Sequence, residues 1–134
     1  MSGFLDTNVI VRYLTGDPPS MAEQAAKILA NGDDLYVTDV VIAEVDHVLS
    51  SVYQVPRATI VDHLITLMQR GNITPFGLPK DVVIQGLMLC RPSGRVSIPD
   101  AMIWAAARSS TTRLVYTFDR RFPSDGVSLR QSLE

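Results

Sequence analysis

Short apolar segments alternate along the chain with longer amphipathic ones, and this pattern predicts strands and helices in turn. The expected strands are Gly3–Leu5, Leu35–Thr38, Ile73–Phe76, Leu114–Thr117 and an edge strand at Val127–Leu129. The expected helices are Met21–Ala30, Asp39 to Val52, Arg57–Arg70, Pro79 to Cys90 and Ser97 to Ser109. The segment Asn8–Thr15 is apolar with one arginine, and the Gly-Asp-Pro-Pro run after it breaks the chain.

Capping residues mark where these helices begin and end. Ser20, Asp39 and Ser97 each stand before an apolar helical pattern, so we expect them to be N-caps. Asn31-Gly32 and Gly71-Asn72 are typical of helix ends. These signals divide the chain without leaving a linker or a repeat.

Strands that alternate with helices favour parallel pairing through helical crossovers. The sequence therefore predicts an α/β protein, a three-layer α/β/α sandwich around a short, mainly parallel central sheet. A length of 134 residues suits one domain, which we expect to span 1–134. Ligands of such sheets bind beyond the carboxyl ends of the strands, which points to the residues after Leu5 and Thr117.

Composition narrows the class of protein. The chain is 46% hydrophobic and 19% charged, as globular proteins are. No apolar run reaches the roughly 20 residues that cross a bilayer, and the N-terminus does not resemble a signal peptide, so we expect no membrane role. Cys90 is the only cysteine, which excludes an intrachain disulfide and a cysteine zinc cluster. A cytoplasmic protein is the simplest interpretation.

Charge is unevenly distributed. The net charge of −2 argues against a general nucleic-acid binder. Residues 1–67 carry 3 basic and 9 acidic residues, a balance of −6, and residues 68–134 carry 9 and 5, a balance of +4. Ten of the twelve basic residues are arginine, which suits bidentate phosphate contact, although any one of them could equally solvate a helix face.

Two aspartates stand at the carboxyl ends of expected strands. Asp6 follows Phe4-Leu5 directly, and Asp119 lies two residues beyond the strand ending at Thr117. Parallel strands bring such residues to one edge of the sheet. Taken singly, Asp6 could be only a helix N-cap, and Asp119 only a turn residue paired with a neighbouring arginine.

Two further acids lie on expected helices. Glu44 lies about 60° around the helix from Val41, at the rim of the apolar stripe of Val41, Val45, Val48 and Val52, whereas Asp46 is expected on a more exposed side. Asp100 opens an almost wholly apolar helix at capping-box spacing from Ser97. Glu44 could be a solvated charge, and Asp100 could serve only the cap and the helix dipole.

The four carboxylates carry more weight together. Two charges about 5 Å apart repel by on the order of 3 kcal/mol at an effective dielectric of 20, so four would not gather without a cation or raised pKa values. Oxygen ligands select hard ions, which predicts Mg²⁺ or Mn²⁺. His47 and His63 have no partner at ligand spacing, which disfavours zinc. Such a site serves phosphodiester hydrolysis.

At these residues the sequence resembles the PIN-domain nucleases, most closely the VapC-type toxins of toxin–antitoxin pairs. Four segments carry the resemblance, in the family's order: Phe4-Leu5-Asp6-Thr7-Asn8-Val9-Ile10, Ala43-Glu44 within Val40–Val48, Ile98-Pro99-Asp100-Ala101 leading into Trp104–Ala107, and Thr117-Phe118-Asp119. The resemblance covers nearly the whole chain. It implies a PIN-like α/β/α sandwich and metal-dependent endoribonuclease activity.

The resemblance also assigns residues and partners. It implies that Asp6, Glu44, Asp100 and Asp119 are catalytic metal ligands, that Asn8 and Thr117 support them, and that Mg²⁺ or Mn²⁺ is bound. It implies an RNA substrate, a cognate antitoxin protein and a homodimer. Position near the proposed site makes five arginines candidates for RNA phosphate contact: Arg91, Arg95, Arg108, Arg120 and Arg121.

Three other interpretations differ in what they require. A haloacid-dehalogenase-like phosphohydrolase needs a second aspartate where this chain has Asn8, and it and a receiver domain need a lysine after a late strand. Only Lys27 and Lys80 are present. The third alternative is a non-cleaving PIN-fold module that binds RNA or protein, which metal-dependent cleavage would exclude.

Overall fold

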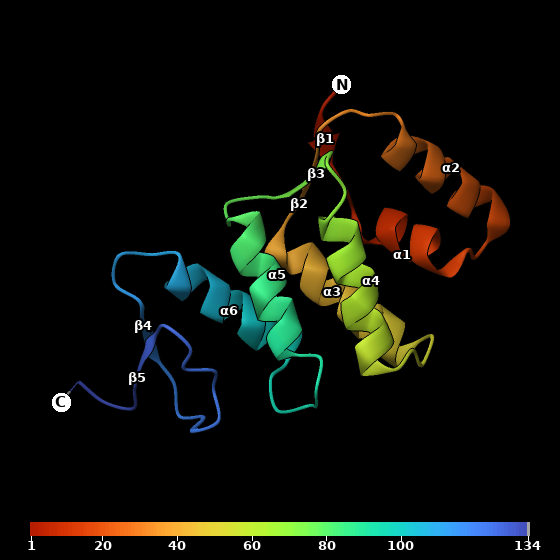
Figure 1. The fold of residues 1–134 in the computed structure, drawn as a ribbon. Helices are drawn as coiled ribbons and strands as arrows, with labels where there is room; N and C mark the ends of the chain where they lie inside the picture. Colours follow the sequence, from red (N-terminus) through yellow and green to blue (C-terminus); the bar gives the residue numbers. More distant parts are fainter. Residues whose placement is uncertain (134) are drawn as a thin grey trace.

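The computed structural model describes residues 1–133, and within them the chain forms six helices and five short strands (Figure 1). Their order is β1 (Gly3–Phe4), α1 (Thr7–Thr15), α2 (Pro19–Ala30), β2 (Leu35–Val37), α3 (Asp39–Ser51), α4 (Arg57–Met68), β3 (Ile73–Pro75), α5 (Lys80–Leu89), α6 (Ile98–Arg108), β4 (Leu114–Tyr116) and β5 (Ser128–Arg130). Strands and helices therefore occur where the apolar pattern placed them, and Asn8–Thr15 belongs to a helix.

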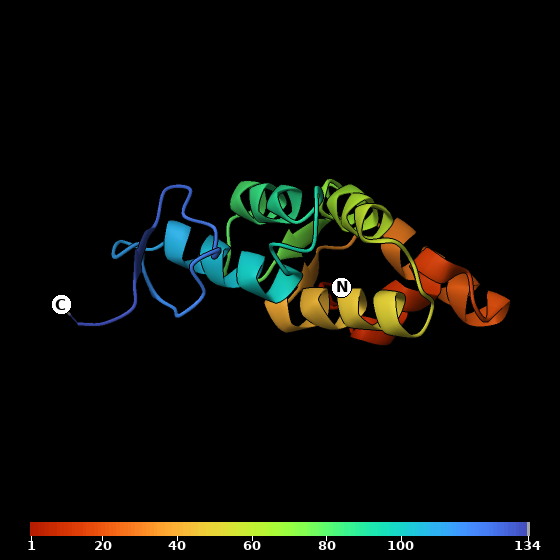
Figure 2. The same ribbon diagram turned by 90° about the horizontal axis from the view of Figure 1, so that it is seen from below.

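The strands pair in parallel, as alternation with helices predicted. β1, β2 and β3 form a three-stranded sheet in that order, with Phe4 opposite Tyr36 and Tyr36 opposite Thr74. β4 and β5 form a separate two-stranded parallel sheet. Figures 1 and 2 both place this second sheet at the far end of α6, away from the first. The parallel strands are thus divided between two sheets.

Helices surround the three-stranded sheet in layers. Seen from below, α4 and α5 form one layer and α1 and α3 another, with strands between them (Figure 2). This mixed arrangement of six helices and a short parallel sheet is consistent with the expected three-layer α/β/α fold. No helix within residues 1–133 has both the length and the apolar character needed to cross a lipid bilayer.

Two apolar clusters stabilise the molecule. The larger joins β1–β3 to helices α1–α5 and the start of α6, through fully buried side chains such as Val37, Leu64 and Leu87. The smaller consists of Trp104, Ala105, Val115 and Phe122, which join the second half of α6 to β4. The second cluster anchors the C-terminal strands to α6.

The contact between α5 and α6 depends on a glycine. A Cβ added at Gly86 would lie 3.1 Å from the backbone oxygen of Ala101 and 3.4 Å from the indole of Trp104. Because a side chain there would have to displace backbone, Gly86 allows the two helices to approach closely. This contact fixes α6, and with it the position of Asp100.

The helix caps differ from expectation at two positions. Thr38 rather than Asp39 is the N-cap of α3, because its hydroxyl accepts a hydrogen bond from the Val41 N–H at 3.3 Å. Ser20 lies inside α2, which begins at Pro19. Proline is favoured in the first turn since the N–H it lacks has no helical partner there. Ser97 caps α6 as predicted.

Candidate functional site

Asp6 lies just beyond β1, where the chain turns into α1. It is the N-cap of α1, and its Oδ1 accepts a hydrogen bond from the Thr7 N–H at 2.8 Å. The side chain is exposed. The capping role considered from the sequence is therefore real, but it uses only one carboxylate oxygen and leaves the other free to bind a ligand.

Asp100 occupies the first turn of α6 and is half-buried. Its backbone N–H donates to the Ser97 hydroxyl at 3.1 Å, which confirms one half of the expected capping box. Among residues 1–133 no hydrogen bond or ion pair involves the Asp100 carboxylate. The cap thus holds the backbone of Asp100 while its side chain has no protein partner.

Glu44 lies on α3, with its side chain exposed. The fully buried stripe of α3 is Ile42, Val45 and Leu49, while Val52, expected in the stripe, is the C-cap and 69% exposed. The stripe is therefore centred closer to Ile42 than the sequence suggested. Helical geometry places Glu44 about 100° from Val45, at the flank of the buried face.

Glu44 and Asp100 adjoin the same hollow. A cavity of about 370 Å³ lies between α3 and α6, lined by Val40 and Ala43 on one side and by Pro99 and Met102 on the other. Ala43 and Pro99 directly precede Glu44 and Asp100 in the sequence. The packing of α3 against α6 therefore brings these two acid-bearing turns to the rim of one hollow.

Asp119 lies in the turn after β4 and is exposed. Its Oδ1 accepts from the Arg121 N–H at 2.8 Å, and its own N–H donates to the Thr117 hydroxyl at 3.0 Å. Thr117, predicted as a supporting residue, thus shapes the turn that carries Asp119. This turn belongs to the second sheet, at the end of the molecule away from β1 (Figure 1).

The four acids do not form one cluster within a single chain. Among residues 1–133, no three histidine, cysteine, aspartate or glutamate side chains are grouped as metal ligands. The residue types suit a hard divalent cation, because all four side chains offer carboxylate oxygens. The residue chemistry therefore fits Mg²⁺ or Mn²⁺, whereas their arrangement in one chain does not.

Asp46 differs from its predicted environment. The sequence placed it on a more exposed side of α3 than Glu44, but the structure shows it half-buried and Glu44 exposed. This follows from the shift of the buried stripe toward Ile42. Burial raises the pKa of the Asp46 carboxyl above its ordinary value of 3.8, against the opposing attraction of the Arg57 guanidinium and of His47.

Asp46→Asn is expected to raise the melting temperature at pH 7 and to change it little at pH 3. A carboxyl whose folded pKa is raised binds its proton more tightly in the folded state, so stability falls as pH rises from 3.8 through the folded pKa. The amide carries no such cost. Thermal unfolding at both pH values measures the difference, with Asp34→Asn as an exposed control. An equal shift at both pH values would contradict this explanation.

The five arginines proposed for phosphate contact differ in their surroundings. Arg91 forms a bidentate ion pair with Asp62, with Nε–Oδ1 and Nη2–Oδ2 distances of 2.8 and 2.9 Å. Arg95 donates from Nη1 to the backbone oxygen of Arg121 at 3.0 Å, close to the turn of Asp119. Arg108 packs against Gly126, and Arg120 and Arg121 are exposed. Arg91 must release Asp62 before its guanidinium can pair fully with phosphate.

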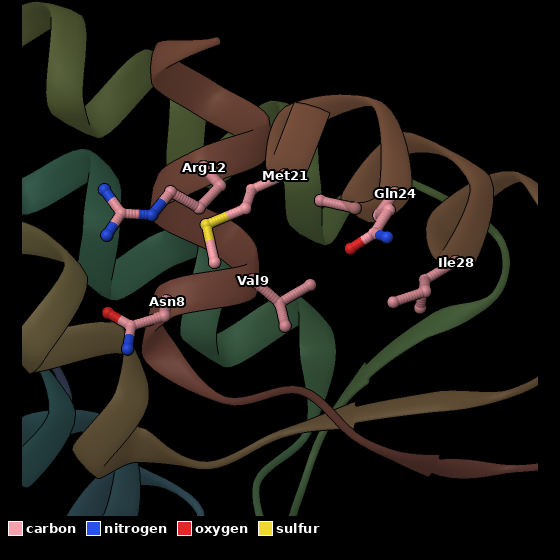
Figure 3. Close-up of a pocket in the computed structure, with 7 residues that line it drawn as sticks. Asn8, Val9, Arg12, Met21, Gln24 and Ile28 are labelled. Atoms are coloured by element: carbon pink, nitrogen blue, oxygen red, sulfur yellow. The ribbon is translucent and has the colours of Figure 1, made fainter. Parts of the chain in front are cut away.

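The sequence reasoning missed a pocket beside Asp6. A cavity of about 160 Å³ lies between α1 and α2, lined by the polar side chains of Asn8, Arg12 and Gln24 and by apolar neighbours (Figure 3). Arg12 donates from Nη1 to the Asp17 backbone oxygen and to the Tyr53 hydroxyl, both at 3.3 Å. The i, i+4 spacing of Asn8 and Arg12 was the signal for a shared face. Asn8, predicted to support Asp6, therefore faces this pocket.

Comparison with known proteins identifies the family. The PIN domain family matches residues 3–124, which include the segments that carry Asp6, Glu44, Asp100 and Asp119. A search of curated proteins found no match to the chain. PIN domains are generally nucleases that use divalent metal ions. Since the match spans most of the sequence and the α/β architecture agrees with it, the chain belongs to the PIN domain family.

Proposed function

We propose that this protein is a Mg²⁺- or Mn²⁺-dependent endoribonuclease that hydrolyses RNA phosphodiester bonds. The observation that carries the proposal is the presence of all four acids within the matched span of 3–124: Asp6, Glu44, Asp100 and Asp119. Each is an oxygen donor of the kind that hard cations select. On this proposal, residues 1–134 form a single nuclease domain.

The state of the carboxylates supports a role in binding a cation. Ion pairs in residues 1–133 join Asp33, Glu23 and Asp62 to basic groups, and none includes a proposed ligand. Asp6 and Asp119 accept only local backbone N–H groups, each at 2.8 Å. The proposed ligands thus keep carboxylate oxygens that no basic side chain neutralises.

The resemblance to VapC-type toxins extends the proposal to partners. The protein would be the toxin of a toxin–antitoxin pair, with a cognate antitoxin as its protein partner and RNA as its substrate. It would act as a homodimer. A cytoplasmic location would agree with the single cysteine, Cys90, which is fully buried and whose pKa burial raises to about 11.

Metal dependence is the direct test. Purified protein is incubated with structured and unstructured RNA in Mg²⁺, in Mn²⁺ or in EDTA, and fragments are resolved on a denaturing gel. Cleavage is expected in both metals and none in EDTA, with activity restored when metal is added back. Cleavage that persists in EDTA would contradict the proposal, as would folded protein that neither cuts RNA nor binds Mn²⁺ in titration calorimetry.

A second candidate function is a PIN-fold module that binds RNA or protein without cutting. One observation favours it: no three potential ligands are grouped within residues 1–133. The same assay separates the two functions. RNA retained by the protein in a gel-shift experiment, and unchanged after incubation with Mn²⁺, would support the binding module.

A further inference from the structure

The two sheets each present an unpaired strand edge. The order β1-β2-β3 leaves β1 at one edge of the first sheet, and β4 pairs only with β5 in the second. Within residues 1–133, the remaining side of β1 and that of β4 therefore have no strand partner. All the pairings present are parallel, so the two edges could be joined in the same sense.

The side chains on these edges match in character. Phe4 of β1 is 59% exposed and Tyr116 of β4 is 57% exposed, whereas their neighbours Leu5 and Val115 are buried. Phe4 belongs to an aromatic group with ring centroids 5.3 Å from Tyr36 and 5.0 Å from Phe76. Because successive side chains of a strand point to opposite faces, setting Phe4 beside Tyr116 also sets Leu5 on the face of Val115.

The chain's own β4 is held away from its own β1. Five residues, 109–113, connect the end of α6 to β4. Val115 and Phe122 pack against Trp104 on α6, and the Trp104 Nε1–H donates to the Asp125 backbone oxygen at 2.9 Å. Figures 1 and 2 show the resulting separation between the two sheets. A strand beside β1 must therefore come from another molecule.

Charge favours a second copy as that molecule. Residues 1–44, around β1, contain seven acidic and two basic residues, a balance of −5. Residues 110–133, around β4 and β5, contain four arginines and two aspartates, a balance of +2. The C-terminal segment of one copy is thus complementary in charge to the β1 edge of another.

We propose that two copies of this chain exchange their C-terminal segments, with β4 of each pairing in parallel with β1 of the other. With Phe4 beside Tyr116, Asp6 falls beside Phe118 and next to Asp119 of the partner copy, on strands about 4.8 Å apart. Each acidic site then takes Asp6 from one copy and Asp119 from the other. The catalytic meaning of this exchange rests on the proposed nuclease function, whereas the strand pairing itself does not.

Disulfide trapping tests the pairing without any assay of activity. Full-length Phe4→Cys and Tyr116→Cys chains are co-expressed, oxidised and run on a non-reducing gel, each also alone. A disulfide between the two different chains is expected, because adjacent strands place Cα atoms within the range a disulfide bridges. Thr74→Cys paired with Tyr116→Cys is the matched control, since Thr74 is exposed on the same face of the sheet but on β3.

Three results would overturn the exchange. One is a monomer by light scattering over the whole concentration range. Another is a disulfide that forms only within a single chain carrying both substitutions. The third is a dimer in which the Thr74 control is trapped as readily as Phe4.

Complementation tests the shared site. Asp6→Asn and Asp119→Asn chains are each expected to be inactive, while their co-expression restores about one quarter of the wild-type rate, because half the dimers are mixed and each has one complete site. Full wild-type activity of Asp119→Asn alone would overturn the shared site, as would a mixture no better than its parts. Wild-type protein that cuts no RNA defeats the nuclease function instead, and the trapping result still decides the exchange.

Discussion

Asp6→Asn is expected to lower the rate of metal-dependent RNA cleavage by about a hundredfold or more while leaving the melting temperature nearly unchanged. The substitution removes a negative charge from the proposed cation site, and losing about 3 kcal/mol of charge stabilisation in the transition state corresponds to that factor. Folding is spared because asparagine caps a helix as well as aspartate does. The Thr7 N–H therefore keeps an acceptor.

Asp34→Asn is the matched control for this experiment. Asp34 is exposed like Asp6, but it precedes β2 and so lies at the opposite end of the strands. Its replacement should leave cleavage within about twofold of wild type, as a surface charge remote from the reaction should. Equal losses in the two variants would show that Asp6 acts only through overall charge. A large fall in the melting temperature of Asp6→Asn would mean that asparagine does not replace the cap.

Trp104→Ala is expected to reduce the free energy of unfolding by about 3–5 kcal/mol, the range for removing a large aromatic side chain from a core. Trp104 is 3% exposed and is the largest member of the cluster that anchors β4. Its loss also leaves the Asp125 backbone oxygen without the indole donor. Denaturant titration followed by circular dichroism measures the change.

Ile103→Ala is the control on the same helix. Ile103 is 51% exposed, so its truncation should cost less than about 1 kcal/mol. Hydrogen exchange refines the comparison, because Trp104→Ala should release the amides of β4 and β5 more than those of β2. The interpretation fails if the two variants lose the same stability, or if protection is lost evenly across both sheets.

The sequence predicted the elements well because their signals are local. Apolar periodicity marked the helices and the short strands, and Ser97 with Pro99 identified the start of α6. The α3 cap was missed by one residue because Thr38 and Asp39 are both good caps, and only the hydroxyl contact with Val41 distinguishes them. The inversion of Glu44 and Asp46 has a similar cause. The pattern of valines did not reveal that Ile42 and Leu49 centre the buried stripe.

The division of the strands could not be predicted from local signals. Every strand looked like a member of one sheet, because an apolar segment does not encode its neighbour. The separation arises from packing of Trp104 and Phe122, which are distant in sequence from β1. For the same reason the four acids were recognisable by their motifs, whereas the distances among them depend on how α6 and the second sheet are placed.

A proline limits how far the three-stranded sheet can grow. β3 forms the edge opposite β1 and ends at Pro75, and the Phe76 N–H donates to the Val37 oxygen at 2.8 Å, toward β2. Backbone groups alternate in direction along a strand, so the nitrogen of Pro75 faces outward, where it has no hydrogen to offer an incoming chain. One side of the sheet is thereby closed to further strands. Molecules that join at β1 can form finite pairs, but they lack the second adhesive edge that a growing fibre requires.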